Sequence, residues 1–111
     1  MKAIDSAKAH YKSLEVLSTE VPQWGQNGNP LEVYYTPMTL AEKNKLFKYA
    51  KDDDLEIMAY AVILKCLDAD GNKLFDLGDK RALMTEVDSD VVAELAAKLM
   101  NGVSVEDQAG N

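Results

Sequence analysis

A corner that contains the only tryptophan constrains the fold more than any other feature of the sequence. Residues 21–25 read Val-Pro-Gln-Trp-Gly, and an extended run precedes them at 13–21. A second extended run follows at 31–36, after a stretch of Gly, Asn and Pro residues that favour turns through positive φ, local side-chain hydrogen bonds or a fixed φ. The two runs predict a β-hairpin. Pro22 and Pro37 should end the pairing, because proline lacks a backbone N–H donor.

A helix start follows the hairpin. Thr39 and Glu42 have the spacing of a capping box, in which each side chain bonds to the backbone N–H of the other residue. The helix is predicted over 40–51, and lysines cover much of its surface. Because this segment has no arginine and no glycine-rich loop, we interpret the lysines as a solvated face rather than a phosphate site. The predicted apolar stripe contains Leu40, Phe47 and Ala50, with Leu46 beside it.

Further elements are predicted by periodicity and turn signals. Residues 3–13 have the spacing of a short helix, and residues 54–66 form a helix that is apolar nearly all round and must be covered on most sides. An Asp-Gly pair in 68–72 predicts a tight turn or small hairpin, and one helical turn is predicted around 80–84. The stripe of the first helix contains Ile4, Ala7, Tyr11 and Leu14.

The last helix is predicted from an Asp88 cap to Asn101 and Gly102, a pair that favours a left-handed C-cap. Its buried stripe contains Val91, Leu95 and Leu99. Residues 103–111 are predicted to be a flexible tail. Together these elements predict an α+β fold, a small mainly helical domain over 1–102 in which an N-terminal β-hairpin packs on three or four helices.

Size and charge narrow the classes of protein. The chain has 111 residues, enough for one domain with a real core. Residues 1–51 carry seven lysines and five acids, whereas residues 52–111 carry five bases and fourteen acids. An acidic surface repels phosphate, which counts against nucleic acid as a partner and leaves room for a protein. The longest apolar run is too short to span a membrane and no signal peptide is visible, so we expect a cytoplasmic protein.

The sequence predicts no enzyme, no cofactor and no metal site. The one histidine, His10, stands among lysines, and the one cysteine, Cys66, stands among apolar residues, so they are interpreted as surface and core. Asp52, Asp53 and Asp54 are better explained as a helix cap than as a cation site. The 68–72 segment fails as a calcium loop, because the first and twelfth ligand positions fall on a cysteine and a leucine.

Trp24 has two interpretations. A tryptophan near the tip of a hairpin can anchor a partner, since aromatic side chains dominate many interfaces. It can also fold back over the helices and close a small core, which we consider the stronger interpretation.

The order of these motifs resembles the tail assembly chaperones of long-tailed bacteriophages. The resemblance covers about residues 14–102 and rests on the 21–25 corner, the Pro37-Met38-Thr39 segment with Glu42, the apolar helix and the turn at 68–72. Gln23 stands where the family often has Glu, and Met38 stands where Leu is frequent. Both substitutions leave the corner and cap geometry plausible.

The resemblance implies a non-enzymatic chaperone that binds the tape-measure protein and keeps it soluble while the tail tube polymerises. Such proteins act in the cytoplasm of the bacterial host, are absent from the mature virion and often form homo-oligomers. Some are also made as a longer frameshifted form that contacts the tail tube protein. We predict that apolar residues near Leu95, Leu99 and Met100 on the last helix remain exposed and contact partners, together with Trp24.

Two other functions remain open from the sequence. One is a small structural tail or neck protein that stays in the particle. The other is an acidic inhibitor that occupies the basic groove of a nucleic-acid-binding host protein, for which the acidic C-terminal half is the motivating observation.

Overall fold

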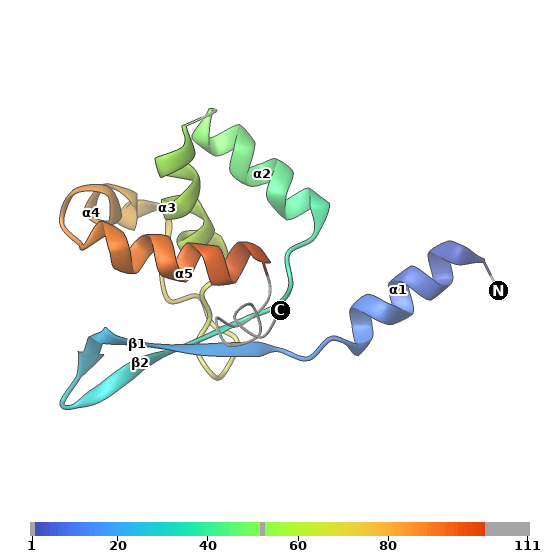
Figure 1. The fold of residues 1–111 in the computed structure, drawn as a ribbon, viewed down its shortest axis with the longest axis horizontal. Coiled ribbons are helices and arrows are strands. Elements are labelled where there is room, and N and C mark those ends of the chain that lie inside the picture. The colour runs from blue at the N-terminus through green and yellow to red at the C-terminus, as the bar shows by residue number, and fades with distance from the viewer. Residues whose placement is uncertain (1, 52, 102–111) are drawn as a thin grey trace.

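The structure, a computed structural model, describes residues 2–51 and 53–101 and has the predicted α+β class (Figure 1). A two-stranded antiparallel hairpin lies along one side of a group of helices, and an N-terminal helix projects away from both (Figure 1). The elements are α1 (Ala3–Ser13), β1 (Leu17–Gln26), β2 (Asn29–Tyr35), α2 (Leu40–Ala50), α3 (Asp54–Lys65), the 3₁₀ helix η1 (Leu77–Asp79), α4 (Lys80–Thr85) and α5 (Ser89–Asn101).

The hairpin is longer than the sequence predicted. Regular pairing runs from Leu17↔Tyr35 to Val21↔Leu31, so it does stop before Pro22, but a bulged segment carries β1 on to Gln26. The turn is the two-residue Asn27-Gly28 step, and both residues have positive φ (54° and 80°), as a type I′ turn requires. The predicted start at residue 13 was wrong, because 13 belongs to the helix before the strand.

Gly25 is required where β1 passes close to β2. A Cβ atom at this position would lie 1.9 Å from the backbone oxygen of Asn29. The bulge therefore depends on a residue without a side chain, which explains why glycine follows Trp24 in the corner.

The main core lies between the hairpin, α3 and α5. Val33 and Tyr35 of β2 pack with Val62 and Ile63 of α3, and all four side chains are buried. α5 closes the other side of this core with Leu95 and Leu99. The predicted packing of the hairpin on helices is thus confirmed. The buried members of the cluster are Val21, Val33, Tyr35, Ala59, Val62, Ile63, Cys66, Leu83, Val91, Val92, Leu95 and Leu99.

α2 joins the core through only part of the stripe that was predicted. Its buried residues are Leu46 and Ala50, whereas Leu40 and Phe47 are exposed. Leu46 packs with Ala61 of α3 and with α5 in a second small cluster. The predicted capping box at the start of α2 is confirmed, with both reciprocal hydrogen bonds present.

The 68–72 turn adds a short β-like connection, as predicted. Leu67 pairs with Tyr34 on one side and with Lys73 on the other, so this small hairpin lies against the free edge of β2. The Asp68 carboxylate accepts bonds from the backbone N–H groups of Asp70 and Asn72, and Gly71 takes the positive φ that the turn needs.

Two of the predictions concern residues outside the described part of the chain. These are the Gly102 cap with the 103–111 tail, and Asp52 in the acidic cluster. Asp53 is the N-cap of α3 and accepts from the N–H groups of Leu55 and Glu56. No helix in the described part of the chain is long and apolar enough to span a bilayer.

Candidate interaction surfaces

Two of the three predicted partner-binding residues of α5 are buried. Leu95 is 3% exposed and Leu99 is fully buried, so the expectation that they remain exposed was wrong. The physical reason is the orientation of α5, whose apolar stripe faces α3 and the hairpin. Met100 is only partly buried and packs against the small cluster formed by α2, α3 and α5.

Trp24 is half-buried and covers the core, which agrees with the stronger of its two interpretations. Its ring meets Phe75 edge to face, with 6.0 Å between centroids and 73° between planes. A shallow apolar depression of about 260 Å³ lies beside this pair and is lined also by Leu31, Leu83 and Val87. Part of the Trp24 side chain therefore remains at the surface.

A larger groove separates α2 from η1, and we call it the α2–η1 groove. It has a volume of about 450 Å³, and Ile63 and Leu64 of α3 form its apolar floor. Tyr49 and Leu77 stand on its two sides and are both exposed. Lys45, Lys73 and Asp76 complete the lining, so the groove is apolar at its base and more basic than acidic at its edge.

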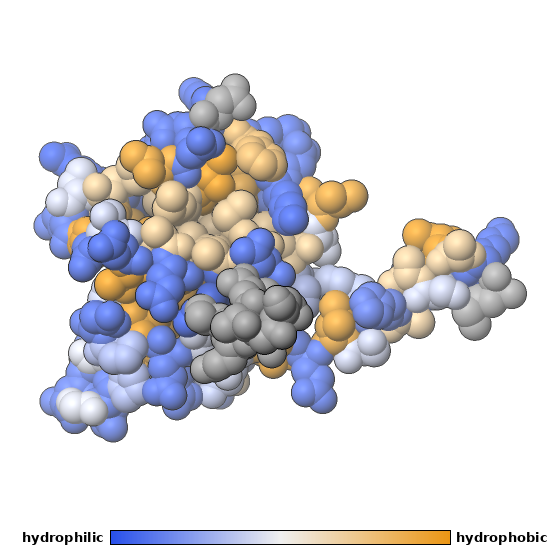
Figure 2. Space-filling view, in the orientation of Figure 1, coloured by the Kyte–Doolittle hydropathy of each residue, from blue (hydrophilic) through white to orange (hydrophobic). Residues whose placement is uncertain are grey.

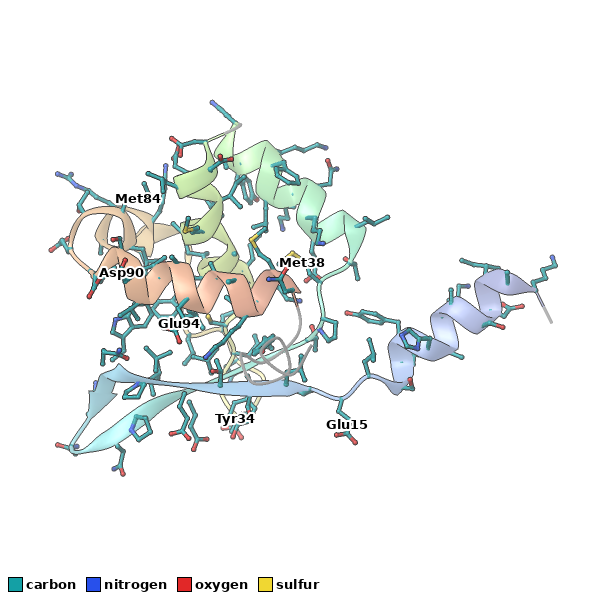
Figure 3. All side chains as sticks on the ribbon, viewed as in Figure 1. Glu15, Tyr34, Met38, Met84, Asp90 and Glu94 are labelled. Atoms are coloured by element: carbon teal, nitrogen blue, oxygen red, sulfur yellow. The ribbon has the colours of Figure 1, made fainter. Side chains whose placement is uncertain are left out.

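A second apolar groove lies between α3, α4 and the start of α5, and we call it the α3–α4 groove. It has a volume of about 100 Å³ and is lined by Leu55, Met58, Ala59, Leu83, Met84 and Val92, with Ser89 as its polar member. Leu55 is 65% exposed and Met84 is 39% exposed, so both present apolar surface to solvent. Met84 and Asp90 lie at the end of the body that is remote from α1 (Figure 3).

Residues 2–16 also present apolar surface. We call this segment the N-terminal arm. Every residue of the arm is exposed, including Ile4, Tyr11 and Leu14 on the predicted stripe. Figure 2 shows apolar surface on this projecting segment, beside hydrophilic side chains. The Tyr11 hydroxyl donates to the carbonyl oxygen of Pro37 at 2.7 Å, which ties the end of α1 to the segment before α2.

A buried lysine was missed by the sequence analysis. Lys65 at the end of α3 is 4% exposed, and its Nζ donates to the Glu42 carboxylate at 2.9 Å and to the Thr36 hydroxyl at 3.0 Å. These bonds connect the end of β2, the cap of α2 and α3. Because these hydrogen bonds hold three elements together, we assign Lys65 a structural role.

Cys66, His10 and Asp68 lie in three different environments. Burial raises the pKa of the Cys66 thiol to about 12, so it is a poor nucleophile at neutral pH. His10 lies on the exposed arm. Backbone hydrogen bonds, foremost from Asn72, lower the pKa of the Asp68 carboxyl. Asp68 therefore stabilises the 68–72 turn. Among residues 2–51 and 53–101, no three His, Cys, Asp or Glu side chains are arranged to hold a metal ion.

The sequence matches no protein family model, no curated protein and no solved structure. The motifs of the sequence and the geometry of these apolar surfaces are therefore the observations that bear on function.

Proposed function

We propose that this protein is a tail assembly chaperone of a long-tailed bacteriophage or prophage, which binds the tape-measure protein and keeps it soluble in the host cytoplasm. The ordered motifs that resemble this family support the proposal, and the reciprocal Thr39–Glu42 cap and the half-buried Trp24 give them consistent structural roles. In this proposal the protein is not an enzyme and is absent from the mature virion.

The observation that carries the proposal is the α2–η1 groove. A tape-measure protein is a long helical chain with apolar stripes, and a helix of this kind is recognised by an apolar groove with polar edges. The groove offers Tyr49 and Leu77 as exposed walls over a floor of Ile63 and Leu64. Aromatic and aliphatic walls of this kind exclude water from a bound apolar stripe.

The charges at the groove edge indicate which client helix fits best. Lys45 and Lys73 outnumber Asp76, and the Lys45 ammonium lies 5.9 Å from the centre of the Tyr49 ring. A client stripe bordered by Asp or Glu would pair with these lysines, whereas a lysine-rich border would be repelled. A tail tube protein bound through a longer frameshifted form is an additional partner in this proposal.

Co-expression with the tape-measure protein tests the function. We expect the client to be soluble and to co-purify with this protein, and we expect Leu77→Asp to return the client to the insoluble level seen without it. Leu40→Asp is the matched control, because Leu40 is 85% exposed on the outward face of α2 and does not line the groove.

If the client stays soluble with the Leu77→Asp variant, the α2–η1 groove is not where the client binds. No gain in client solubility with the folded wild-type protein would contradict the chaperone function itself. Detection of this protein in purified virions would favour a structural tail component instead.

A further inference from the structure

We propose that the free edge of β1 is a peptide-binding site, which takes a basic, extended segment of a partner protein as a third strand of the sheet. The hairpin has two strands, so each strand has one outer edge. The outer edge of β2 is covered, because the N–H of Tyr34 donates to Leu67 and its C=O accepts from Leu67, both at 2.8 Å. Among residues 2–51 and 53–101, no backbone group pairs with β1 from outside the hairpin.

The bonds of Tyr34 also show which backbone groups of β1 are free. Along an antiparallel pair, residues that bond to the partner strand alternate with residues whose N–H and C=O groups point away from it. Tyr34 bonds away from β1, so Tyr34 and its partner Ser18 share no backbone hydrogen bonds, and the Ser18 groups also point outward. The same alternation turns the backbone groups of Glu20 outward. Pro22 comes next and has no N–H group, so the open edge ends there.

A groove of about 260 Å³ lies beside this edge, and we call it the β1–α5 groove. One wall is residues 19–23 of β1, and the other is formed by the α5 residues Val91, Glu94, Leu95 and Lys98. No residue of β2 or α3 lines the groove, so it lies on the side of β1 that carries the free edge. A strand added here would bond to β1 through its backbone and place alternate side chains against α5, which is a common mode of peptide recognition.

The charges on the exposed face of the hairpin favour a basic occupant. Glu20 and Glu32 are directly opposite each other, and both side chains are exposed. Like charges in this arrangement repel each other. The Tyr34 hydroxyl donates to the Glu32 carboxylate at 2.8 Å, whereas Glu20 makes no ion pair within the described part of the chain. A lysine or arginine on an added strand beside Glu20 would relieve this repulsion.

The helix side of the β1–α5 groove carries a second carboxylate. Glu94 is 64% exposed and lies on α5 above β1 (Figure 3). Lys98 is 16% exposed, and its Nζ already donates to the Thr19 hydroxyl at 2.9 Å. Basic side chains of a bound strand can therefore meet Glu20 on one face of the sheet and Glu94 on the other.

Charge also argues against two other occupants. The ten residues after Asn101 contain Glu106 and Asp107 and no lysine or arginine, and a second copy of β1 would bring a further Glu20 to the edge. Either occupant would add carboxylates to an edge that already carries them. The β1–α5 groove shares no lining residue with the α2–η1 groove, so this inference does not depend on the proposed client.

Amide hydrogen exchange with a synthetic peptide tests the site. The probe is Lys-Val-Lys-Val-Lys-Val-Lys, and the controls are the same peptide with Glu in place of Lys and with Pro in place of the middle Val. In the free full-length chain, the amides of Ser18 and Glu20 should exchange fast, whereas those of Thr19 and Val21 should be protected by β2. The lysine peptide should protect Ser18 and Glu20, and neither control peptide should do so. Protection of Ser18 and Glu20 without peptide would show that this chain covers its own edge, and would overturn the proposal.

A charge reversal tests the predicted contact. Glu20→Lys should raise the dissociation constant of the lysine peptide about tenfold or more. The same change replaces a repelling pair with an attractive one opposite Glu32, so the thermal midpoint should not fall and unfolding cannot explain the loss. Glu86→Lys is the matched control, because Glu86 is exposed and lies outside the β1–α5 groove, and it should bind like the wild type.

Three results would overturn the proposal. The wild type could fail to bind the lysine peptide, or bind it without protection of Ser18 and Glu20. Equal losses of affinity in Glu20→Lys and Glu86→Lys would show that the peptide responds only to the net charge of the protein.

Discussion

The helices α1 and α5 are both amphipathic by sequence, yet α5 is packed in the core and α1 is exposed. α5 buries five residues against α3 and the hairpin, whereas each residue of α1 is exposed. The spacing of apolar residues identifies which side chains share a face, but it does not identify what covers that face. For α5 the cover is in the same chain. For α1, the described residues 2–51 and 53–101 bury none of its side chains.

The largest expected effect is truncation of the α5 stripe. Leu99→Ala should lower the free energy of unfolding by about 2–5 kcal/mol, because it removes a fully buried side chain and leaves a cavity. Ile4→Ala in α1 is the matched change and should alter the stability of the dilute protein by less than about 0.5 kcal/mol. Urea unfolding measures the free energy of unfolding of both variants. Equal losses would contradict the claim that α5 is packed in the core and α1 is not.

Gly25→Ala should be the next largest change in the body. A Cβ atom 1.9 Å from the Asn29 oxygen forces two backbone segments apart, at an expected cost of about 3 kcal/mol. Gly71→Ala is the comparison, because Gly71 has φ of 88° and open space around it. Only the backbone conformation disfavours alanine there, so the expected loss of stability is about 1 kcal/mol. Thermal unfolding should rank Gly71→Ala between the wild type and Gly25→Ala, and the reverse order would contradict the bulged path of β1.

The ion pair between buried Lys65 and partly exposed Glu42 predicts a smaller, pH-dependent effect. Glu42→Gln should destabilise the protein at pH 7 by about 1 kcal/mol, a value reduced by solvent screening at a partly exposed carboxylate. Burial alone would raise the pKa of Glu42, but hydrogen bonds from Lys65 and the Thr39 N–H, with the Lys65 charge, lower it overall from its usual 4.5.

The sign of the pH dependence follows from that lowered pKa. The stabilisation by Glu42 is present above its unfolded pKa and is lost as the pH falls through the still lower folded-state pKa. Urea unfolding should therefore show the difference between wild type and Glu42→Gln at pH 7 shrinking as the solution is acidified below about 4.5. A difference that grows on acidification would contradict the assignment.

The smallest expected effect is at the tether of the arm. Tyr11→Phe removes one exposed hydrogen bond to Pro37 and should change the stability of the body by about 0.5 kcal/mol or less. Chemical unfolding monitored by Trp24 fluorescence reports on the body alone. A loss above about 1 kcal/mol would mean that α1 is an integral part of the body.

Local signals in the sequence predicted much of the body. The Thr39–Glu42 pair, the Asp-Gly turn and the Asp88 helix start each satisfy backbone groups within a few residues, so they can be read without knowledge of the fold. The α5 stripe also predicted its own burial.

What the sequence did not reveal depends on neighbours distant in the chain. Lys65 resembles a solvated residue at a helix end until Thr36 and Glu42 are placed beside it. β1 continues past Pro22 because a bulged segment extends it to the Asn27-Gly28 turn. The Asn-Gly pair is a hairpin signal, but it stands in a long stretch of turn-forming residues and was not singled out. The interaction surfaces depend on the packing of α2, α3 and α4. The exposure predicted for Leu95 and Leu99 was therefore wrong, and the two grooves were missed.

Hydrogen exchange of α1 and α5 at several protein concentrations tests the central contrast most directly. We expect the amides of α5 to be protected at every concentration, because their opening requires the core to open. The amides of α1 should exchange almost as fast as those of an unfolded peptide in dilute solution, because each residue of this helix is exposed. Protection of α1 equal to that of α5 at the lowest concentration would contradict the account, because the arm would then have its cover within its own chain.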